Sequence, residues 1–272
     1  MSPPRILVIA GSDSSGGAGI QADIKTITML GGYAMTAITA ITAQNTLGVN
    51  AAQVLSSDLV AAQIEACISD IPVNAVKIGM LGSPEIAHAV ADILEGADIP
   101  IVFDPVMVAT SGSVLASKDT IAGFERLMRL ATLTTPNLPE LAALGGRDAI
   151  LAKSENLLIK DGHGENEQIE DLLITPLGEY SFYSKRIDTR HTHGTGCTLA
   201  SAIATGLGEG LRIDIAVDRA IAFVQKAIAA APGFGRGNGP LGHTLGRVPF
   251  YDLLAALDTT GWDANTFAAR WS

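Results

Sequence analysis

Short apolar runs rich in β-branched residues alternate along this chain with longer segments whose apolar residues recur at helical spacing. The run RILVIA at residues 5–10 is typical of a strand buried on both faces, and residues 33–45 form a second, alternating run. Between these runs, the apolar positions from Ile20 to Leu30 recur every three or four residues, which predicts a helix that ends at Gly31. The chain therefore begins with a predicted strand, helix and strand.

The same two patterns continue along the rest of the sequence. Further strands are predicted at 51–57, 74–81, 100–107, 131–137 and 155–162, with a β-hairpin at 171–187 that turns at Pro176–Gly178. Further helices are predicted at 57–71, 83–96, 117–130 and 138–146, directly after Cys197, at 213–231 and near 249–257. Ser57 or Asp58 is the expected cap of the helix at 57–71, and Ser83 followed by Pro84 is the expected start of the helix at 83–96.

Strands that alternate with helices predict an α/β fold with a mainly parallel sheet and helices on both faces. The sequence contains no internal repeat or linker, so residues 1–272 are expected to form a single domain. In such sheets, ligands bind beyond the carboxyl ends of the strands. The residues that follow predicted strands are Gly11–Gly19, Gln44-Asn45, Gly79-Met80, Asp104-Pro105, Pro136-Asn137, Lys160–His163 and His193–Cys197.

Composition narrows the classes of function. The net charge of −10 argues against a basic, phosphate-neutralising surface, so no nucleic-acid partner is expected. An anionic ligand stays compatible with this charge, because backbone N–H groups can bind phosphate. Cys67 and Cys197 are the only cysteines, too few for a disulfide framework. Because the sequence carries neither a signal-peptide pattern nor an uncharged apolar run of membrane-spanning length, we expect a cytoplasmic protein with no membrane partner.

A glycine-rich segment, GSDSSGGAG at residues 11–19, lies between the first predicted strand and the first predicted helix. A P-loop requires a Gly-Lys pair, which the chain lacks, and the spacing of Gly11, Gly16 and Gly19 does not match a Rossmann fingerprint. Two interpretations remain open. The segment is either a tight strand-to-helix turn or a loop whose backbone closes over a small ligand.

The segment TPNLPE places Asn137 and Glu140 three residues apart at the start of a predicted helix, where both side chains share one face. Together they could hold water molecules around a Mg²⁺ ion, which prefers oxygen ligands and keeps several waters. The alternative is a helix cap, in which Asn137 satisfies the first turn and Glu140 complements the helix dipole.

The segment HTHGTGC precedes an apolar helix, and its glycines allow the backbone N–H groups of Thr195, Gly196 and Cys197 to point into one concavity after Gly194. Such a concavity is an anion hole for charge that develops in phosphoryl or acyl transfer. Cys197 has three interpretations. It is a nucleophile with His193 as base, a base whose thiol pKa the helix start lowers, or a small buried residue.

Gln44 follows the second predicted strand, and its amide carries a donor beside an acceptor. This pairing matches the edge of an aminopyrimidine, as it matches adenine in nucleic acids. The other candidates are weaker. Cys67 lies on an apolar helix face and is expected in the core, His88 is expected at the surface, and His191 with His193 lacks the further ligands of a metal site.

Taken together, these segments resemble a known family. The matching blocks are GSDSSGGAGIQADIKT, TAITAQNTLGV, VKIGMLGS, FDPVMVATSG, TPNLPE, IKDGH and HTHGTGCTLASAIA. They occur in order between residues 5 and 210 and are similar to those of the bacterial hydroxymethylpyrimidine/phosphomethylpyrimidine kinases, which are ribokinase-like vitamin kinases. The resemblance fades from Ile213 onward.

The resemblance implies a doubly wound, ribokinase-like fold and a homodimer. It also implies that the enzyme uses ATP and Mg²⁺ to phosphorylate 4-amino-5-hydroxymethyl-2-methylpyrimidine and then its monophosphate, for thiamine synthesis. Gln44 would bind the pyrimidine in a pocket lined by Gly11, Asp23 and Met80. Asn137, Glu140 and Lys160 would bind the nucleotide and its metal, and Asn137 and Glu140 would hold Mg²⁺ through water. The anion hole would be formed by Gly194, Thr195, Gly196 and Cys197, with Cys197 as the base.

Two departures from the family pattern concern the nucleotide. The segment 138–159 is shorter than in the family, so we expect a single helix there, and position 161 is Asp instead of Gly. Three other functions stay open. The first is a pyridoxine or pyridoxal kinase, the second an acyl-transfer enzyme that uses Cys197 and His193, and the third a pyrimidine-binding protein without catalysis.

Overall fold

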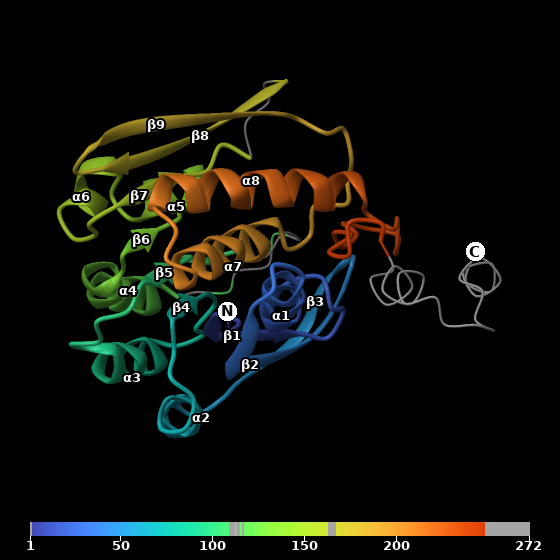
Figure 1. The fold of residues 1–272 in the computed structure, drawn as a ribbon. Helices are drawn as coiled ribbons and strands as arrows, with labels where there is room; N and C mark the ends of the chain where they lie inside the picture. The colour runs from blue at the N-terminus through green and yellow to red at the C-terminus, as the bar shows by residue number, and fades with distance from the viewer. Residues whose placement is uncertain (1, 109–111, 113–114, 116, 163–166, 248–272) are drawn as a thin grey trace.

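The computed structural model describes residues 2–108, 112, 115, 117–162 and 167–247, and its centre is one nine-stranded sheet (Figure 1). The strands are β1 (Arg5–Asp13), β2 (Tyr33–Asn45), β3 (Gly48–Val54), β4 (Ala75–Ile78), β5 (Ile101–Phe103), β6 (Leu133–Thr134), β7 (Leu157–Ile159), β8 (Gln168–Thr175) and β9 (Gly178–Lys185). The helices are α1 (Gly19–Met29), α2 (Ser57–Ile68), α3 (Pro84–Leu94), α4 (Lys118–Leu130), α5 (Leu138–Ala143), α6 (Arg147–Leu151), α7 (Thr195–Gly208) and α8 (Ile213–Ala229).

The strand order is β3-β2-β1-β4-β5-β6-β7-β8-β9, and the run from β2 to β7 is parallel. Antiparallel strands close both ends, with β3 beside β2 and the β8–β9 hairpin beside β7. The chain first moves outward from β1 to β2 and β3, and then returns to place β4 on the other side of β1. This reversal creates a switch point between β1 and β4, where open α/β sheets bind ligands. The expected mainly parallel α/β sheet is confirmed.

Helices cover both faces of the sheet (Figure 1). One face carries α1, α7 and α8, and the other carries α2, α3 and α4. Successive residues of β1 point to opposite faces, so Leu7 and Ile9 enter one core while Ile6 and Val8 enter the other. Burial on both faces explains why this strand is apolar at every position rather than alternating.

Several expected boundaries differ from the observed ones. Ser56 caps α2 instead of Ser57 or Asp58, because Ser56 has extended backbone angles and its Oγ accepts the Leu59 N–H at 3.3 Å. The segment 11–19 is not all loop, since β1 continues through Asp13 after a register shift that follows Ala10. The helix expected near 249–257 falls outside the described residues.

The segment 138–159 contains two short helices, α5 and α6, where a single one was expected. Gly145 and Gly146 both have positive φ angles, 92° and 88°, which only glycine adopts readily. Two consecutive residues of this kind reverse the chain sharply enough for two short helices to fit. Two further expectations agree with the structure: Ser83 caps α3 with Pro84 in its first turn, and the hairpin turns through Pro176 and Leu177.

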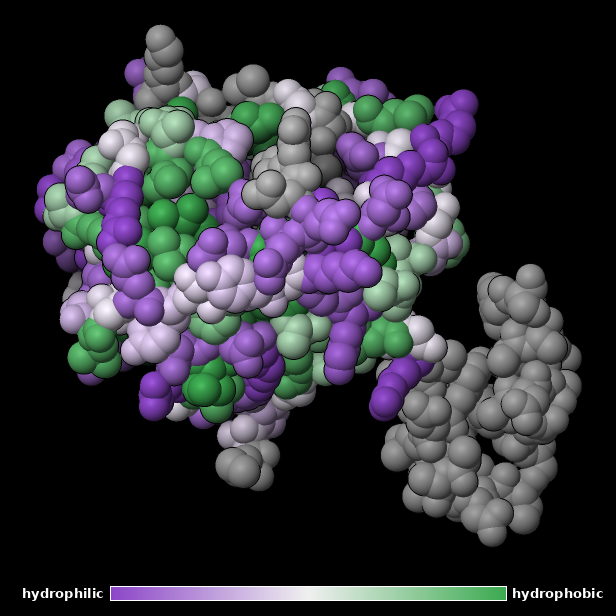
Figure 2. Space-filling view, turned by 90° about the horizontal axis from the view of Figure 1, so that it is seen from above, coloured by the Kyte–Doolittle hydropathy of each residue, from purple (hydrophilic) through white to green (hydrophobic). Residues whose placement is uncertain are grey.

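The face seen from above in Figure 2 mixes hydrophilic and hydrophobic residues. The hairpin strand β9 contributes to this pattern, because its residues alternate between exposed and half-buried positions. In the part of the chain that the structure describes, none of the helices is both long and apolar enough to cross a bilayer.

Candidate active site

A cavity of about 890 Å³ opens at the carboxyl ends of the parallel strands and at the start of α7. Its lining contains every predicted site residue except Asp23: Gly11, Gln44, Met80, Asn137, Glu140, Lys160, Gly194, Thr195, Gly196 and Cys197. These residues lie at or just after the ends of β1, β2, β4, β6 and β7 and at the start of α7, and the fold brings them together because the carboxyl ends of parallel strands meet along one edge of the sheet.

Asp23 does not line this cavity, and its prediction as a pocket residue is wrong. Its side chain is fully buried in the α1 layer, where both carboxylate oxygens contact Lys77 Nζ, at 3.0 and 2.9 Å. Ser201 Oγ donates a further hydrogen bond of 2.7 Å to Asp23 Oδ1. Burial raises the pKa of Asp23, and the positive charge of Lys77 opposes that rise. Lys77 points into this layer from β4 and therefore requires a buried counter-ion, which is the position Asp23 fills.

The start of α7 forms a compact turn against the glycine-rich segment. Gly194 has a φ of 90°, and a Cβ at this position would lie 1.9 Å from the Gly17 carbonyl oxygen. Glycine is therefore needed for both backbone conformation and space. Of the three amides predicted to face the anion hole, that of Thr195 donates to the Thr192 carbonyl at 3.3 Å. The amides of Gly196 and Cys197 stay available at the positive end of a 14-residue helix.

A charged pair lies directly in front of this helix start. Lys160 Nζ contacts Asp104 Oδ1 at 2.7 Å, and Thr135 Oγ1 donates to the same oxygen at 3.1 Å. A Cβ on Gly196 would lie 3.5 Å from Asp104 Oδ2 and 3.6 Å from Lys160 Nζ, so both charged groups lie within van der Waals distance of the helix start. Burial by itself would lower the pKa of Lys160, but the charges of Asp104 and Glu140 raise it above its ordinary value. Lys160 therefore stays an ammonium ion at neutral pH.

Asn137 and Glu140 confirm the capping interpretation of TPNLPE, and the Mg²⁺ interpretation stays a prediction. They form a capping box at the start of α5, since Asn137 Oδ1 accepts the Glu140 N–H and Glu140 Oε2 accepts the Asn137 N–H, each at 2.9 Å. Both also line the cavity. Burial raises the pKa of the Glu140 carboxyl, and Lys160 opposes that shift.

The donor set suits a magnesium ion held mainly by water and ligand phosphates. The carboxyl groups of Glu140 and Asp104 supply oxygen, the ligand atom that Mg²⁺ prefers. Across the described ranges, no group of three or more His, Cys, Asp or Glu residues is arranged to hold a metal by itself. His191 and His193 accordingly do not form a metal site there.

Cys197 is half-buried on the cavity wall, but its acidity differs from the expectation. Burial raises the pKa of its thiol to about 11, the charge of Lys77 opposes this rise, and the Gly19 N–H donates a hydrogen bond to the sulfur. The expected lowering of the pKa by the helix start is therefore wrong, because desolvation outweighs the helix dipole. At neutral pH the resting side chain is a thiol.

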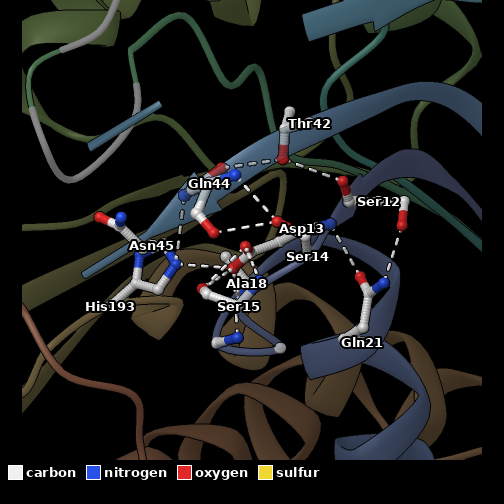
Figure 3. A network of polar contacts seen from close by, with 12 residues as sticks. Ser12, Asp13, Ser14, Ser15, Ala18, Gln21, Thr42, Gln44, Asn45 and His193 are labelled. Carbon is white, nitrogen blue, oxygen red and sulfur yellow. Dashed lines mark hydrogen bonds and ion pairs between the residues drawn. The ribbon is translucent and has the colours of Figure 1, made fainter. Parts of the chain in front are cut away.

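The imidazole of His193 contacts Asp13 and Gln44 rather than Cys197. Its Nε2 lies 2.7 Å from Asp13 Oδ2 and 3.3 Å from the amide nitrogen of Gln44 (Figure 3). In the structure as described, no hydrogen bond joins His193 to Cys197, so the Cys–His dyad of the acyl-transfer hypothesis is not assembled. Asp13, like Asp104, was not predicted as a site residue, although each is an acidic residue at the end of a buried strand.

The remaining predicted residues form the apolar wall and its surroundings. Met80 covers Gly11 so closely that a Cβ at Gly11 would lie 2.3 Å from Met80 Cε. Asp161 does not line the cavity, and its backbone N–H donates to Asp171 Oδ1 at 3.0 Å. Away from the site, Cys67 is partly buried against the core and His88 is exposed, as expected.

Comparison with known proteins identifies the family. The model of the family "Phosphomethylpyrimidine kinase" matches residues 13–242. The hydroxymethylpyrimidine/phosphomethylpyrimidine kinase of Streptomyces coelicolor is 44% identical over 257 residues, which cover 89% of this chain and 95% of that protein.

Two solved structures share the fold. A pyridoxal kinase of Bacillus subtilis, solved as an ADP complex, has a TM-score of 0.83 at 32% identity and covers 91% of this chain and 100% of its own. A phosphomethylpyrimidine kinase of Clostridium difficile has a TM-score of 0.72 at 39% identity and covers 83% of this chain and 99% of its own. The sheet is thus that of the ribokinase-like vitamin kinases, and the chain belongs to the phosphomethylpyrimidine kinase family.

Proposed function

We propose that this protein transfers the γ-phosphoryl group of ATP to 4-amino-5-hydroxymethyl-2-methylpyrimidine, and then to the resulting monophosphate, in thiamine biosynthesis. The observation that carries the proposal is the start of α7, where the amides of Gly196 and Cys197 lie beside Lys160 in a cavity that also contains Gln44. Phosphoryl transfer needs alignment and charge stabilisation more than covalent chemistry, and this arrangement provides both.

The cationic and amide groups would act on the migrating phosphoryl group. Lys160 would exchange its contact with Asp104 for the phosphate oxygens, and the two amides would donate to the same charge. Glu140 and Asp104, with Asn137 holding Glu140 in place, would bind Mg²⁺ largely through water. A bound Mg²⁺ ion would neutralise charge on the phosphates.

Cys197 would accept the proton of the substrate hydroxyl in the first step. Because burial holds its pKa at about 11, only the minor thiolate form could accept this proton, so the thiol would first have to release its own proton to solvent. The second step needs no such base, since a phosphate acceptor is already ionised at neutral pH. Cys197→Ala is therefore expected to lose phosphorylation of the alcohol and to keep phosphorylation of the monophosphate. A covalent adduct trapped on Cys197 would instead support acyl transfer.

A pyridoxal kinase is the second candidate, and the higher TM-score of the Bacillus subtilis pyridoxal kinase favours it. An ATP-consumption assay with each alcohol distinguishes the two. We expect consumption with the hydroxymethylpyrimidine, and consumption with pyridoxal alone would overturn the assignment. Tight binding of the pyrimidine without any ATP turnover would make the protein a binding protein instead.

A further inference from the structure

The side chain of Gln44 is held by a network of residues that the proposed reaction does not itself use (Figure 3). At its centre is Asp13, a nearly buried carboxylate that accepts the backbone N–H groups of Ser15, Gly17 and Ala18 at 2.8, 3.1 and 2.9 Å. Although burial works against ionisation, the hydrogen bond to His193 and those from the loop lower the pKa of Asp13 to about 2. Asp13 is therefore an anion at neutral pH and can only accept hydrogen bonds.

This charge fixes the proton on His193. Its Nε2 lies 2.7 Å from Asp13 Oδ2, and an acceptor-only oxygen at that distance requires a hydrogen on the nitrogen. His193 Nε2 is thus a donor whether the ring is neutral or charged. The Gln44 side chain, 3.3 Å from the same Nε2, consequently meets an N–H group rather than a lone pair.

The second neighbour of the Gln44 amide is Thr42. Its hydroxyl donates to the Ser12 carbonyl oxygen at 3.0 Å and lies 3.2 Å from Gln44 Oε1, so the amide as placed turns its oxygen to Thr42 and its nitrogen to His193. If the Thr42 hydrogen points to Ser12, the hydroxyl oxygen offers Gln44 only lone pairs. Turning the amide over places its oxygen beside the His193 N–H, which it then shares with Asp13 as a second acceptor, and its NH₂ beside the Thr42 lone pairs. The orientation as placed sets a donor against a donor at His193.

The backbone of Gln44 is fixed independently of its side chain. Ser14 Oγ accepts the Gln44 N–H at 2.8 Å and donates to the Gln44 carbonyl at 2.9 Å. The pairing of β2 with β3 shifts register between Ala43 and Gln44, an irregularity of the kind that redirects a side chain. Ser14 therefore fixes the backbone position of Gln44, whereas the Asp13–His193 pair sets the orientation of its side-chain amide.

We propose that Asp13, acting through His193, is a specificity-determining positioning residue that holds the Gln44 amide with its oxygen toward His193 and its nitrogen toward Thr42. Each amide atom then keeps one unused position, a lone pair on oxygen and a hydrogen on nitrogen, for the ligand. This is the pattern that binds an exocyclic amine beside a ring nitrogen. Rotation of the amide would exchange the two positions and would turn the hydroxymethyl group of an aminopyrimidine away from Cys197. The inference rests on the proposed function only for the identity of the ligand.

The test compares kcat/KM for the hydroxymethylpyrimidine with kcat/KM for the same alcohol without its amino group. His193→Phe removes the donor, and we expect about a tenfold loss for the aminated alcohol and less than about a twofold loss for the other. His193→Gln supplies an N–H to Asp13 and is expected to restore most of the preference. His191→Gln is the matched control, since His191 neither contacts Gln44 nor lines the cavity, and it is expected to keep the wild-type preference.

A double-mutant cycle separates positioning from general structural damage. In a Gln44→Ala background the orientation of the amide no longer matters, so adding His193→Phe is expected to change kcat/KM for the aminated alcohol by less than about twofold. The same tenfold loss in that background, or an unchanged preference in His193→Phe, would overturn the proposal. If the wild-type protein fails to phosphorylate the pyrimidine, the proposed function fails, and Kd values for the two alcohols in the same variants still decide the positioning claim.

Discussion

Two lysine–aspartate pairs lie near Cys197, and they differ in their access to the cavity. Lys77 and Asp23 are both fully buried and lie outside the cavity lining. Lys160 and Asp104 line the cavity, and 12% of the Lys160 side chain is exposed. Both lysines keep a pKa above the ordinary value, because burial, which would lower it, is outweighed by nearby carboxylates.

This difference in access gives the Lys77–Asp23 pair a structural role and the Lys160–Asp104 pair its proposed role in binding phosphate. The Lys77–Asp23 pair lies outside the cavity lining, and the Asp23 carboxylate is stabilised by Lys77 and by the hydrogen bond from Ser201. The Lys160–Asp104 pair has one side open to the cavity at the start of α7, so Lys160 can exchange a carboxylate for a phosphate. The sequence places Lys160 just after a short strand and Lys77 inside another, but it identifies the carboxylate partner of neither lysine.

We call Lys77–Asp23 the enclosed pair and Lys160–Asp104 the open pair. Breaking the enclosed pair is expected to have the largest effect. Lys77→Met leaves the Asp23 charge buried without its counter-ion, and we expect a loss of about 3–5 kcal/mol in the free energy of unfolding. Denaturant titration measures this loss, and adding Asp23→Asn is expected to recover part of it. Arg126→Ala, which breaks an exposed pair with Glu95, is the control and should have little effect. A Lys77→Met protein as stable as the wild type would show that the pair is not structurally important.

Breaking the open pair is expected to reduce turnover instead of stability. Lys160→Met removes a cation from the site of phosphoryl transfer, and we expect kcat to fall by about 10²–10³. The free energy of unfolding should fall by less than in Lys77→Met, because Asp104 keeps the hydrogen bond from Thr135 and faces the cavity. Steady-state kinetics at saturating ATP measure the first quantity and denaturant titration the second. A variant that lost stability but kept its kcat would reverse the roles assigned to the two pairs.

The acidity of Cys197 provides a third test. With a pKa of about 11 against an ordinary value of 9.0, its thiolate fraction at pH 8 is about 100-fold below that of an ordinary cysteine. In a Cys67→Ser background, alkylation by iodoacetamide should be slow at pH 8 and should continue to accelerate above pH 10. Lys77→Met should slow it further, since the charge of Lys77 favours the thiolate. A plateau below pH 9 would contradict the assigned burial of the thiol.

The smallest expected effect concerns the hydroxyl group that supports the enclosed pair. Ser201 Oγ donates to Asp23 Oδ1 at 2.7 Å, and a hydrogen bond to a buried charge contributes about 1.5–3 kcal/mol. Ser201→Ala should therefore lower the free energy of unfolding by about this amount, with little change in kcat. The matched variant for the open pair, Thr135→Val, should affect kcat more than stability. Equal effects of the two variants on both quantities would remove the distinction between the pairs.

Much of the fold could be predicted from sequence because its signals are local. The residue periodicities predicted the parallel sheet and its helices, and Ser83 with Pro84 marked the start of α3. The strand ends pointed to the cavity, because glycines and polar residues interrupt apolar runs there. The two helices in 138–159 were missed because the consequence of two successive positive φ angles depends on backbone conformation rather than on residue pattern.

The errors in the site have a different physical origin. Asp23 was placed in the pocket by the family resemblance, and no local pattern links it to its partner Lys77, which is 54 residues away. The lowered pKa that one interpretation of Cys197 required is not found, because a helix start is visible in sequence, whereas enclosure by other elements is not. Asp13 and Asp104 were missed because their importance comes from contacts with His193 and Lys160, at the ends of other segments.

The most direct test of the account is mass spectrometry of the products formed from the hydroxymethylpyrimidine and MgATP by the wild-type protein and by Lys160→Met. We predict that the wild type yields first the monophosphate and then the diphosphate, and that Lys160→Met, though folded, yields neither at a comparable rate. Unmodified alcohol after incubation with the wild type, or equal product from both proteins, would contradict the assignment of phosphoryl transfer to the open pair at the start of α7.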